Sequence, residues 1–102
     1  MQNIINKKRS ELIKLCTLYK IKRLYVFGSV VTTKFSKESD IDFLISFIEN
    51  LSIEEYTNNY FNIHHKLKEL FNRKIDLVTE ATLSNPYFID SINETKELLY
   101  ES

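Results

Sequence analysis

The sequence predicts an α+β fold of two layers, in which a small mixed sheet of about three strands packs against helices. Residues 39–47 alternate in the two-residue period of a strand with one buried face. Residues 52–71 repeat apolar side chains every three or four positions, as an amphipathic helix requires. The expected elements follow the order helix, strand, strand, helix, strand, helix, which gives the sheet helices to pack against.

The first half of the chain is expected to form one helix and two strands. Residues 4–20 predict a helix, because apolar side chains recur at helical spacing at Leu12, Leu15, Cys16 and Tyr19. Residues 22–27 (KRLYVF) predict a strand that stops at Gly28, the single glycine of the chain. The second strand spans 39–47, and its apolar face consists of Ile41, Phe43, Ile45 and Phe47.

The second half is expected to form two helices and a third strand. A Ser-x-x-Glu capping box at residues 52–55 opens the helix 52–71. Residues 74–79 (KIDLVT) predict the third strand. Asn85 and Pro86 open the final helix as its N-cap and first residue. The expected buried side of this helix consists of Phe88, Ile89, Ile92 and Leu99.

Length and composition describe a single domain over residues 1–102. With 43% hydrophobic residues, the chain can bury about two-thirds of its unfolded surface, which excludes general disorder. No run reaches the ~18 apolar residues of a membrane span, and residues 1–14 lack the apolar core of a signal peptide. Cys16 is the single cysteine, so no internal disulfide can form. We therefore expect a soluble cytoplasmic protein with no membrane contact.

Charge is balanced over the whole chain but unevenly distributed. Residues 1–37 contain nine basic residues and one acidic residue, a net charge of +8, so the remainder carries −8. Such asymmetry suits a polyanion or an oppositely charged partner, although the lysines of residues 7–14 are expected to form a solvated helix face. Stable direct binding of nucleic acid is not expected, because such proteins are normally basic overall.

Three of the four aspartates lie in predicted strands, where aspartate is depleted. The two-residue period sends Asp40 and Asp42 to one face, and Asp76 joins them if the third strand pairs beside the second. Such a cluster is unfavourable without cations, and carboxylate oxygens suit Mg²⁺. Two such ions ~3.5–4 Å apart can activate an attacking oxygen and stabilise a leaving pyrophosphate. The alternative is separate surface or turn residues, and it weighs most for Asp76.

Gly28 and Ser29 directly follow the first strand, in the spacing Gly-Ser-x10-Asp-x-Asp. A residue without a Cβ lets the backbone approach a phosphate, and the Ser29 hydroxyl and nearby amides can donate to it. Taken alone, the pair would indicate a simple turn.

Other candidate residues are expected to be structural. His64 and His65 are adjacent on a helix, so their side chains diverge by ~100° and do not easily share a metal; surface or boundary positions are expected. Cys16, Tyr56 and Tyr60 stand at core spacing and are expected to pack. A catalytic thiol and a base-stacking role for the tyrosines are the lesser alternatives.

The segments FGSVVTTKFSKESDIDFLI (27–45) and KIDLV (74–78) together resemble the polymerase-beta-like nucleotidyltransferase superfamily, and within it the minimal nucleotidyltransferases. The resemblance extends through the final NPYFIDSINETKELLY, because minimal members often end in a helix that closes on a tyrosine. It therefore covers nearly the whole chain and implies a polymerase-beta-like palm.

The resemblance also implies roles for individual residues. Asp40 and Asp42 match the paired catalytic aspartates that bind metal, and Asp76 matches the third carboxylate, which acts as base or metal ligand. Gly28 and Ser29 match the loop that binds the nucleotide phosphates.

The chain departs from the family pattern at two positions of this loop. Family members commonly carry an arginine and a glycine four and five residues after the Gly-Ser glycine, where this chain has Thr32 and Thr33. The change bears on loop geometry and on triphosphate affinity, and Lys34 or Lys37 could supply positive charge instead.

Minimal nucleotidyltransferases are similar to the antitoxins of two-gene modules whose other product is a HEPN-domain ribonuclease toxin. The resemblance implies Mg²⁺-dependent transfer of AMP from ATP to a hydroxyl, a tyrosine of that toxin, with two Mg²⁺ ions bound. A chain of 102 residues leaves no room for a separate acceptor-binding domain, which agrees with an acceptor supplied by a partner. Two alternatives stay open: a non-catalytic nucleotide-binding antitoxin that blocks its partner by occlusion, and nucleotide transfer to a small molecule. A homo-oligomer also stays open.

Overall fold

A mixed four-stranded sheet in the order β3-β2-β1-β4 forms the centre of the fold in the computed structural model, which describes residues 3–32, 36 and 38–102. The elements are α1 (Asn3–Lys7), α2 (Arg9–Leu18), β1 (Ile21–Phe27), the 3₁₀ turn η1 (Gly28–Val31), β2 (Ile41–Phe47), α3 (Ile53–Phe71), β3 (Ile75–Thr79), the 3₁₀ turn η2 (Glu80–Thr82), α4 (Pro86–Thr95) and β4 (Glu97–Glu101). β1 pairs antiparallel with β2 and with β4, whereas β2 and β3 are parallel. The parallel pair requires a crossover, and α3 supplies it.

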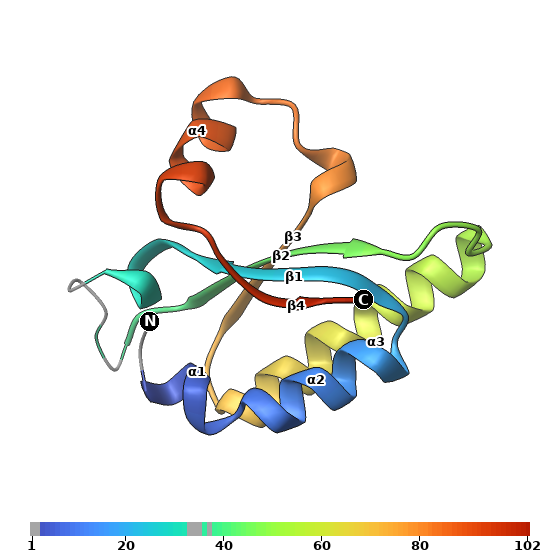
Figure 1. Ribbon diagram of the computed structural model, residues 1–102, viewed down its shortest axis with the longest axis horizontal. Helices are drawn as coiled ribbons and strands as arrows, with labels where there is room; N and C mark the ends of the chain where they lie inside the picture. The colour runs from blue at the N-terminus through green and yellow to red at the C-terminus, as the bar shows by residue number, and fades with distance from the viewer. Residues whose placement is uncertain (1–2, 33–35, 37) are drawn as a thin grey trace.

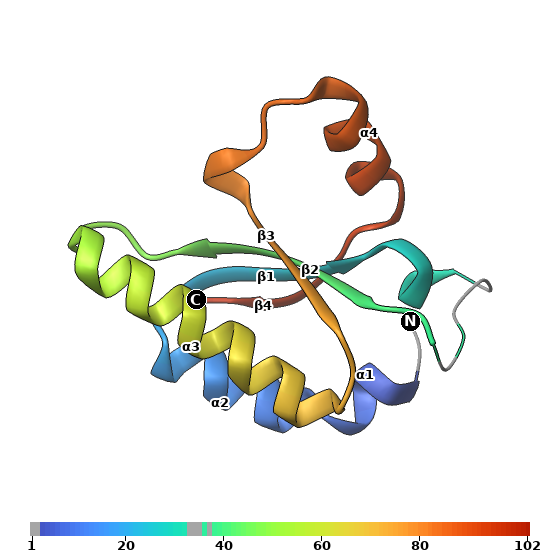
Figure 2. The ribbon, with the colours of Figure 1, turned by 180° about the vertical axis from the view of Figure 1, so that it is seen from behind.

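The helices cover the two faces of the sheet unequally. α1, α2 and α3 lie on one face, and α4 with the segment that leads to it lies on the other (Figures 1 and 2). The first face carries the main core, in which the apolar residues of β2 pack against the three helices: Ile5, Leu12, Cys16, Ile41, Phe43, Ile45, Ile63, Leu67 and Phe71 belong to it. A small second core of Phe27, Leu44 and Ile92 joins α4 to the opposite face.

Capping side chains fix the starts of the two predicted helices of the second half. The Ser52 hydroxyl accepts a hydrogen bond from the Glu55 amide at 3.0 Å, as the capping box predicts. The Asn85 side chain accepts from the amides of Tyr87 and Phe88, and Pro86 follows as the first helical residue. Both helix starts predicted from the sequence are therefore confirmed.

Two predicted helices are wrong in extent. The helix expected over 4–20 is divided at Lys8, whose backbone (φ −108°, ψ 11°) leaves helical geometry, and Ile5 in the first piece is fully buried. The final helix ends at Thr95, and the chain continues as a fourth strand along β1. Leu99 is buried on this strand rather than on a helix, and Phe88 is exposed. The strand forms because it pairs with the otherwise open edge of β1.

Among the described residues, no helix combines the length and the apolar character needed to cross a membrane.

Candidate active site

Parallel pairing of β2 and β3 brings two of the predicted site residues side by side. Asp42 and Asp76 are direct register partners. Their strand neighbours, including Phe43 and Leu77, point into the main core, so both carboxylates lie on the opposite face, the one that carries α4. Asp40 lies immediately before β2, because this strand begins two residues later than the sequence predicts. The structure thus gathers the three predicted aspartates at one end of the β2–β3 pair.

The Asp42 carboxyl group lies close enough to the Asp76 and Asp40 carboxylates to feel their negative charge. Burial raises its pKa to about 6, and the negative charges of Asp76 and Asp40 add to the increase. Asp76 is exposed and Asp40 is half-buried. A cation bound among these groups would therefore relieve a repulsion that is present in the chain itself.

The carboxylates do not form a complete metal-binding group on their own. In the part of the chain that the structure describes, no three histidine, cysteine, aspartate or glutamate side chains are grouped closely enough to hold a metal ion. The full convergence predicted from the sequence is thus not reached. Mg²⁺, however, usually takes one or two carboxylates and completes its shell with water and substrate phosphate oxygens. The acidic cluster fits an ion of that kind.

Gly28 lies against Asp42 and needs its lack of a side chain. Its φ of +77° belongs to the left-handed region, and a Cβ at this position would collide with the Asp42 carboxylate oxygen Oδ2. The Gly28 amide donates to the Thr95 hydroxyl at 2.9 Å, at the last residue of α4. The loop after β1 is therefore in contact with Asp42 and is tied to α4.

Thr32 stabilises this loop locally. Its amide and its hydroxyl both donate to the Ser29 carbonyl, at 3.0 and 3.1 Å. One of the two departures from the family pattern thus closes the turn that carries Ser29. The other, Thr33, and the two lysines considered as sources of charge, Lys34 and Lys37, lie outside the described residues.

Arg73 supports the segment before Asp40 and was missed by the sequence reasoning. Its guanidinium donates to the carbonyls of Ser36 and Ser39, at 3.1 and 2.9 Å. The contact joins residues more than 30 positions apart, as does the bond from Gly28 to Thr95. No local spacing in the sequence signals contacts of this kind.

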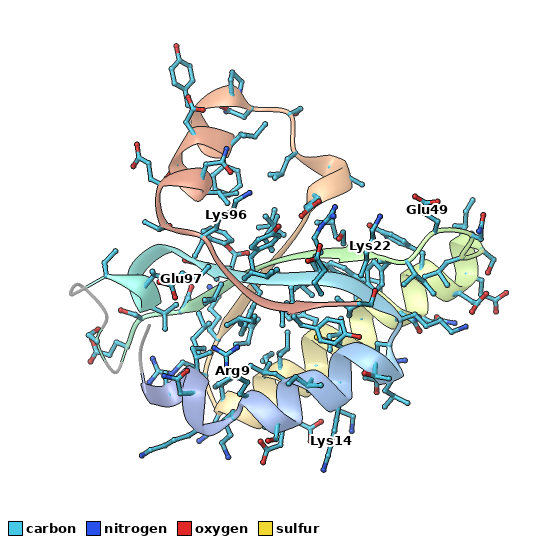
Figure 3. All side chains as sticks on the ribbon, viewed as in Figure 1. Arg9, Lys14, Lys22, Glu49, Lys96 and Glu97 are labelled. Atoms are coloured by element: carbon cyan, nitrogen blue, oxygen red, sulfur yellow. The ribbon has the colours of Figure 1, made fainter. Side chains whose placement is uncertain are left out.

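A pocket of about 410 Å³ opens on the same face of the sheet, between the strands and α4. Leu44, two residues beyond Asp42 on β2, contributes to its floor. Lys96, labelled in Figure 3, lies at the junction of α4 and β4, and its ammonium group stands 4.8 Å from the centre of the Tyr25 ring. Arg23 and Glu80 form an ion pair at 3.3 Å within this lining.

The remaining candidates from the sequence have structural roles. Cys16 is buried, and burial raises the pKa of its thiol to about 12, so it stays protonated in the core. His64 contacts the Ile75 carbonyl, whereas His65 lies 3.0 Å from Glu69 at the surface, so the two imidazoles are directed to different partners. The Tyr56 ring packs on Phe47, with ring centres 4.8 Å apart.

Replacing Asp42 by asparagine should stabilise the protein in the absence of divalent cations. A carboxyl whose pKa rises from 3.8 to about 6 on folding costs stability above pH 6, where it is charged, and nothing below pH 3.8, where both states hold the proton. Because the group is partly solvated, we expect a gain of about 1–2 kcal/mol at pH 7.5. Urea unfolding in EDTA measures it.

The gain should shrink as the pH falls through 6 and vanish near pH 3.5, where wild-type Asp42 is neutral as well. Asp90→Asn, at an exposed position of α4, is the matched control and should change the unfolding free energy by less than about 0.5 kcal/mol. A pH-independent gain for Asp42→Asn would contradict the electrostatic origin of the effect.

The chain is similar to known proteins over most of its length. Residues 10–102 match the family Polymerase beta, Nucleotidyltransferase. The Methanocaldococcus jannaschii protein MJ0126, named as a protein adenylyltransferase, is 32% identical over 100 residues, which cover 98% of this chain and 93% of that protein. MJ0128 of the same organism, with the same name, is 33% identical over 96 residues, 94% of this chain and 90% of that protein.

Solved structures share the fold at lower identity. A minimal nucleotidyltransferase has a TM-score of 0.71 at 23% identity and covers 93% of this chain and 92% of its own. A toxin–antitoxin complex with AMP-PNP has a TM-score of 0.71 at 21% identity, covering 92% and 73%. A complex of the tri-AMPylated Shewanella oneidensis HEPN toxin with its MNT antitoxin has a TM-score of 0.66 at 19% identity, covering 95% and 72%.

The family match covers most of the chain, and it includes the strand aspartates and the glycine loop. The chain belongs to the polymerase beta nucleotidyltransferase family and is a nucleotidyltransferase.

Proposed function

We propose that this protein transfers AMP from ATP to a tyrosine hydroxyl of a HEPN-domain toxin and thereby acts as its antitoxin. The observation that carries the proposal is the pairing of Asp42 with Asp76 beside the Gly28 loop. This arrangement joins a carboxylate suited to a phosphate-bound cation to a second carboxylate that is open to solvent, where an acceptor can approach.

Each residue of the site has a separate role in the proposed reaction. Asp40 and Asp42 would hold Mg²⁺ with the nucleotide phosphates, and the ion would supply charge stabilisation at the α-phosphate and the leaving pyrophosphate. The Ser29 hydroxyl and the amides of the Gly28 loop would donate to phosphate oxygens. Asp76 would accept the phenolic proton while the tyrosine oxygen bonds to the α-phosphorus. The bond between the α-phosphorus and the oxygen bridging to the β-phosphate breaks, and pyrophosphate leaves.

The solved relatives support the choice of substrate and partner. One is a toxin–antitoxin complex with the ATP analogue AMP-PNP, and another contains a tri-AMPylated HEPN toxin. The fold is shared with both. The 32–33% identical relatives are named protein adenylyltransferases, which favours a protein acceptor over a small molecule.

Incubation with ATP labelled at the α-phosphate, Mg²⁺ and the product of the neighbouring gene tests the proposal directly. We expect the label on a tyrosine of the neighbour, identified by mass spectrometry, and release of pyrophosphate. Protection of a cell without any label on the neighbour would favour occlusion. Label on a small molecule of a cell extract, with none on the neighbour, would favour the small-molecule reaction.

Replacing Gly28 by alanine should impair nucleotide binding as well as stability. The new Cβ forces Asp42 aside and meets an unfavourable positive φ, so we expect a loss of about 1–2 kcal/mol in unfolding free energy and at least about tenfold weaker ATP binding in Mg²⁺. Urea unfolding and calorimetric titration with ATP measure the two effects.

Asn50→Ala is the matched control, because Asn50 also has a positive φ, of 72°, but lies in the turn after β2. It shares the backbone strain without the contact with Asp42, so it should lower stability and leave ATP affinity within about twofold. Equal losses of affinity in the two variants would assign the effect to general destabilisation.

A further inference from the structure

β3 carries Asp76 and is an outer strand of the sheet, so the position of Asp76 depends on what holds the open edge of β3. Among the described residues, β2 is its single neighbouring strand. The Ile41 amide on β2 donates to the Lys74 carbonyl at 3.2 Å. Because carbonyls alternate in direction along a strand, those of Ile75 and Leu77 point away from β2. Unpaired edges of this kind open easily and can pair with other chains.

Two side chains of α3 bind these outward carbonyls. The Tyr60 hydroxyl donates to the Leu77 carbonyl at 2.9 Å, and His64 Nε2 lies 3.0 Å from the Ile75 carbonyl. A carbonyl oxygen can only accept, so Nε2 of His64 carries a proton in this contact. At the far end of β3, the Thr82 hydroxyl donates to the Thr79 carbonyl at 3.1 Å, so the third outward carbonyl is also bonded.

The spacing of the helix matches that of the strand. Tyr60 and His64 are four residues apart on one face of α3, a rise of about 6 Å. Ile75 and Leu77 are two residues apart on β3, a rise of about 6.6 Å. The later helix residue bonds the earlier strand residue, so the two elements run in opposite directions and both bonds form together. The two rings also contact each other edge to face, with centres 6.2 Å apart.

Asp76 lies between the two anchored residues. Ile75 and Leu77 bury their side chains in the main core, and their carbonyls are bonded to α3, whereas Asp76 itself is exposed on the other face. We propose that Tyr60 and His64 are positioning residues that hold the backbone on both sides of Asp76 and thus keep its carboxylate in register with Asp42. The role in strand anchoring stands independently, and the role in transfer rests on the proposed function.

α3 supplies a matched control for each residue. His65 follows His64 directly but faces Glu69 at the surface. Tyr56 precedes Tyr60 by one helical turn and packs on Phe47, and its hydroxyl has no hydrogen-bond partner among the described residues. The pair Tyr56→Phe/His65→Leu therefore removes the same chemical groups as Tyr60→Phe/His64→Leu but removes no hydrogen bond to β3. The variant His64→Gln keeps an N–H donor at the end of the side chain and serves as the rescue.

Amide hydrogen exchange measures the anchoring without any activity. In Tyr60→Phe/His64→Leu we expect the amides of Asp76 and Val78, which point to β2, to exchange at least about tenfold faster than in wild type, with the Leu44 amide, which points to β1, unchanged. The control pair should exchange at the wild-type rate. Tyr60→Phe alone should exchange at a rate between those of wild type and the double variant, and His64→Gln should exchange at close to the wild-type rate. Unchanged exchange at Asp76 and Val78 in the double variant would overturn the proposal.

Transfer kinetics then test the positioning of Asp76. With the labelled-ATP assay, the double variant should lose at least about tenfold in kcat, while KM for ATP stays within about twofold, and His64→Gln should recover most of the loss relative to His64→Leu. Faster exchange with unchanged kcat would overturn the positioning role. A wild-type protein that labels no acceptor would instead contradict the proposed function, and the exchange result would still decide whether α3 anchors β3.

Discussion

The variant Asp40→Asn/Asp42→Asn is expected to lose Mg²⁺-dependent ATP binding, with at least about 100-fold weaker affinity, while it keeps its fold. Each carboxylate replaced by an amide removes a charged ligand, and interactions with charged groups are worth about 1.5–3 kcal/mol each. The fold should survive because the variant removes mutual repulsion at Asp42 and no core side chain. Calorimetric titration with ATP, in Mg²⁺ and again in EDTA, measures the effect.

A double variant on α4 provides the control for this loss of charge. Asp90→Asn/Glu94→Gln also removes two carboxylates, both at exposed positions. It should bind ATP in Mg²⁺ as wild type does. ATP binding by the Asp40/Asp42 variant as tight as that of wild type would show that the acidic cluster does not hold the metal of the nucleotide.

Local periodicity was sufficient to predict the elements that carry this cluster. The apolar alternation of Ile41, Phe43 and Ile45 fixes which face of β2 is buried, and therefore where Asp42 points. The long helix α3, between β2 and β3, makes a parallel crossover, and parallel pairing is what brings Asp76 to Asp42. The two strand aspartates could thus be related from the sequence.

Interactions between distant segments explain what the sequence did not predict. Ile92 and Leu99 are seven residues apart, a spacing that suits one helix, so the period alone could not separate α4 from β4. The strand is selected by pairing with β1, some 70 residues earlier. The same limit applies to Arg73, Tyr60 and His64, which act through backbone carbonyls of other segments. Every residue has a backbone carbonyl, so the amino-acid sequence does not show which carbonyl a distant side chain will bind.

Asp76→Asn should separate nucleotide binding from transfer. Asp76 is exposed and lies beside Asp42, so its replacement leaves both Asp40 and Asp42 available to the nucleotide's metal. We expect ATP affinity in Mg²⁺ within a few-fold of wild type. Transfer of AMP should fall by ~10²-fold or more, because asparagine cannot accept the acceptor's proton. Calorimetry and single-turnover labelling with α-labelled ATP measure the two quantities.

The partner distinguishes this catalytic role from inhibition by occlusion. Partner binding by Asp76→Asn should equal that of wild type, as measured by co-purification, since the change removes one exposed carboxylate.

If the protein acts by transfer, the variant should bind the toxin yet fail to protect the cell. Mass spectrometry of the co-expressed toxin should then show an AMP adduct with wild type and none with the variant. If it acts by occlusion, the variant should protect as well as wild type does, because the blocked surface is unchanged. An adduct absent from both would reject the transfer reaction for that partner, since the wild-type site would then be present and unused.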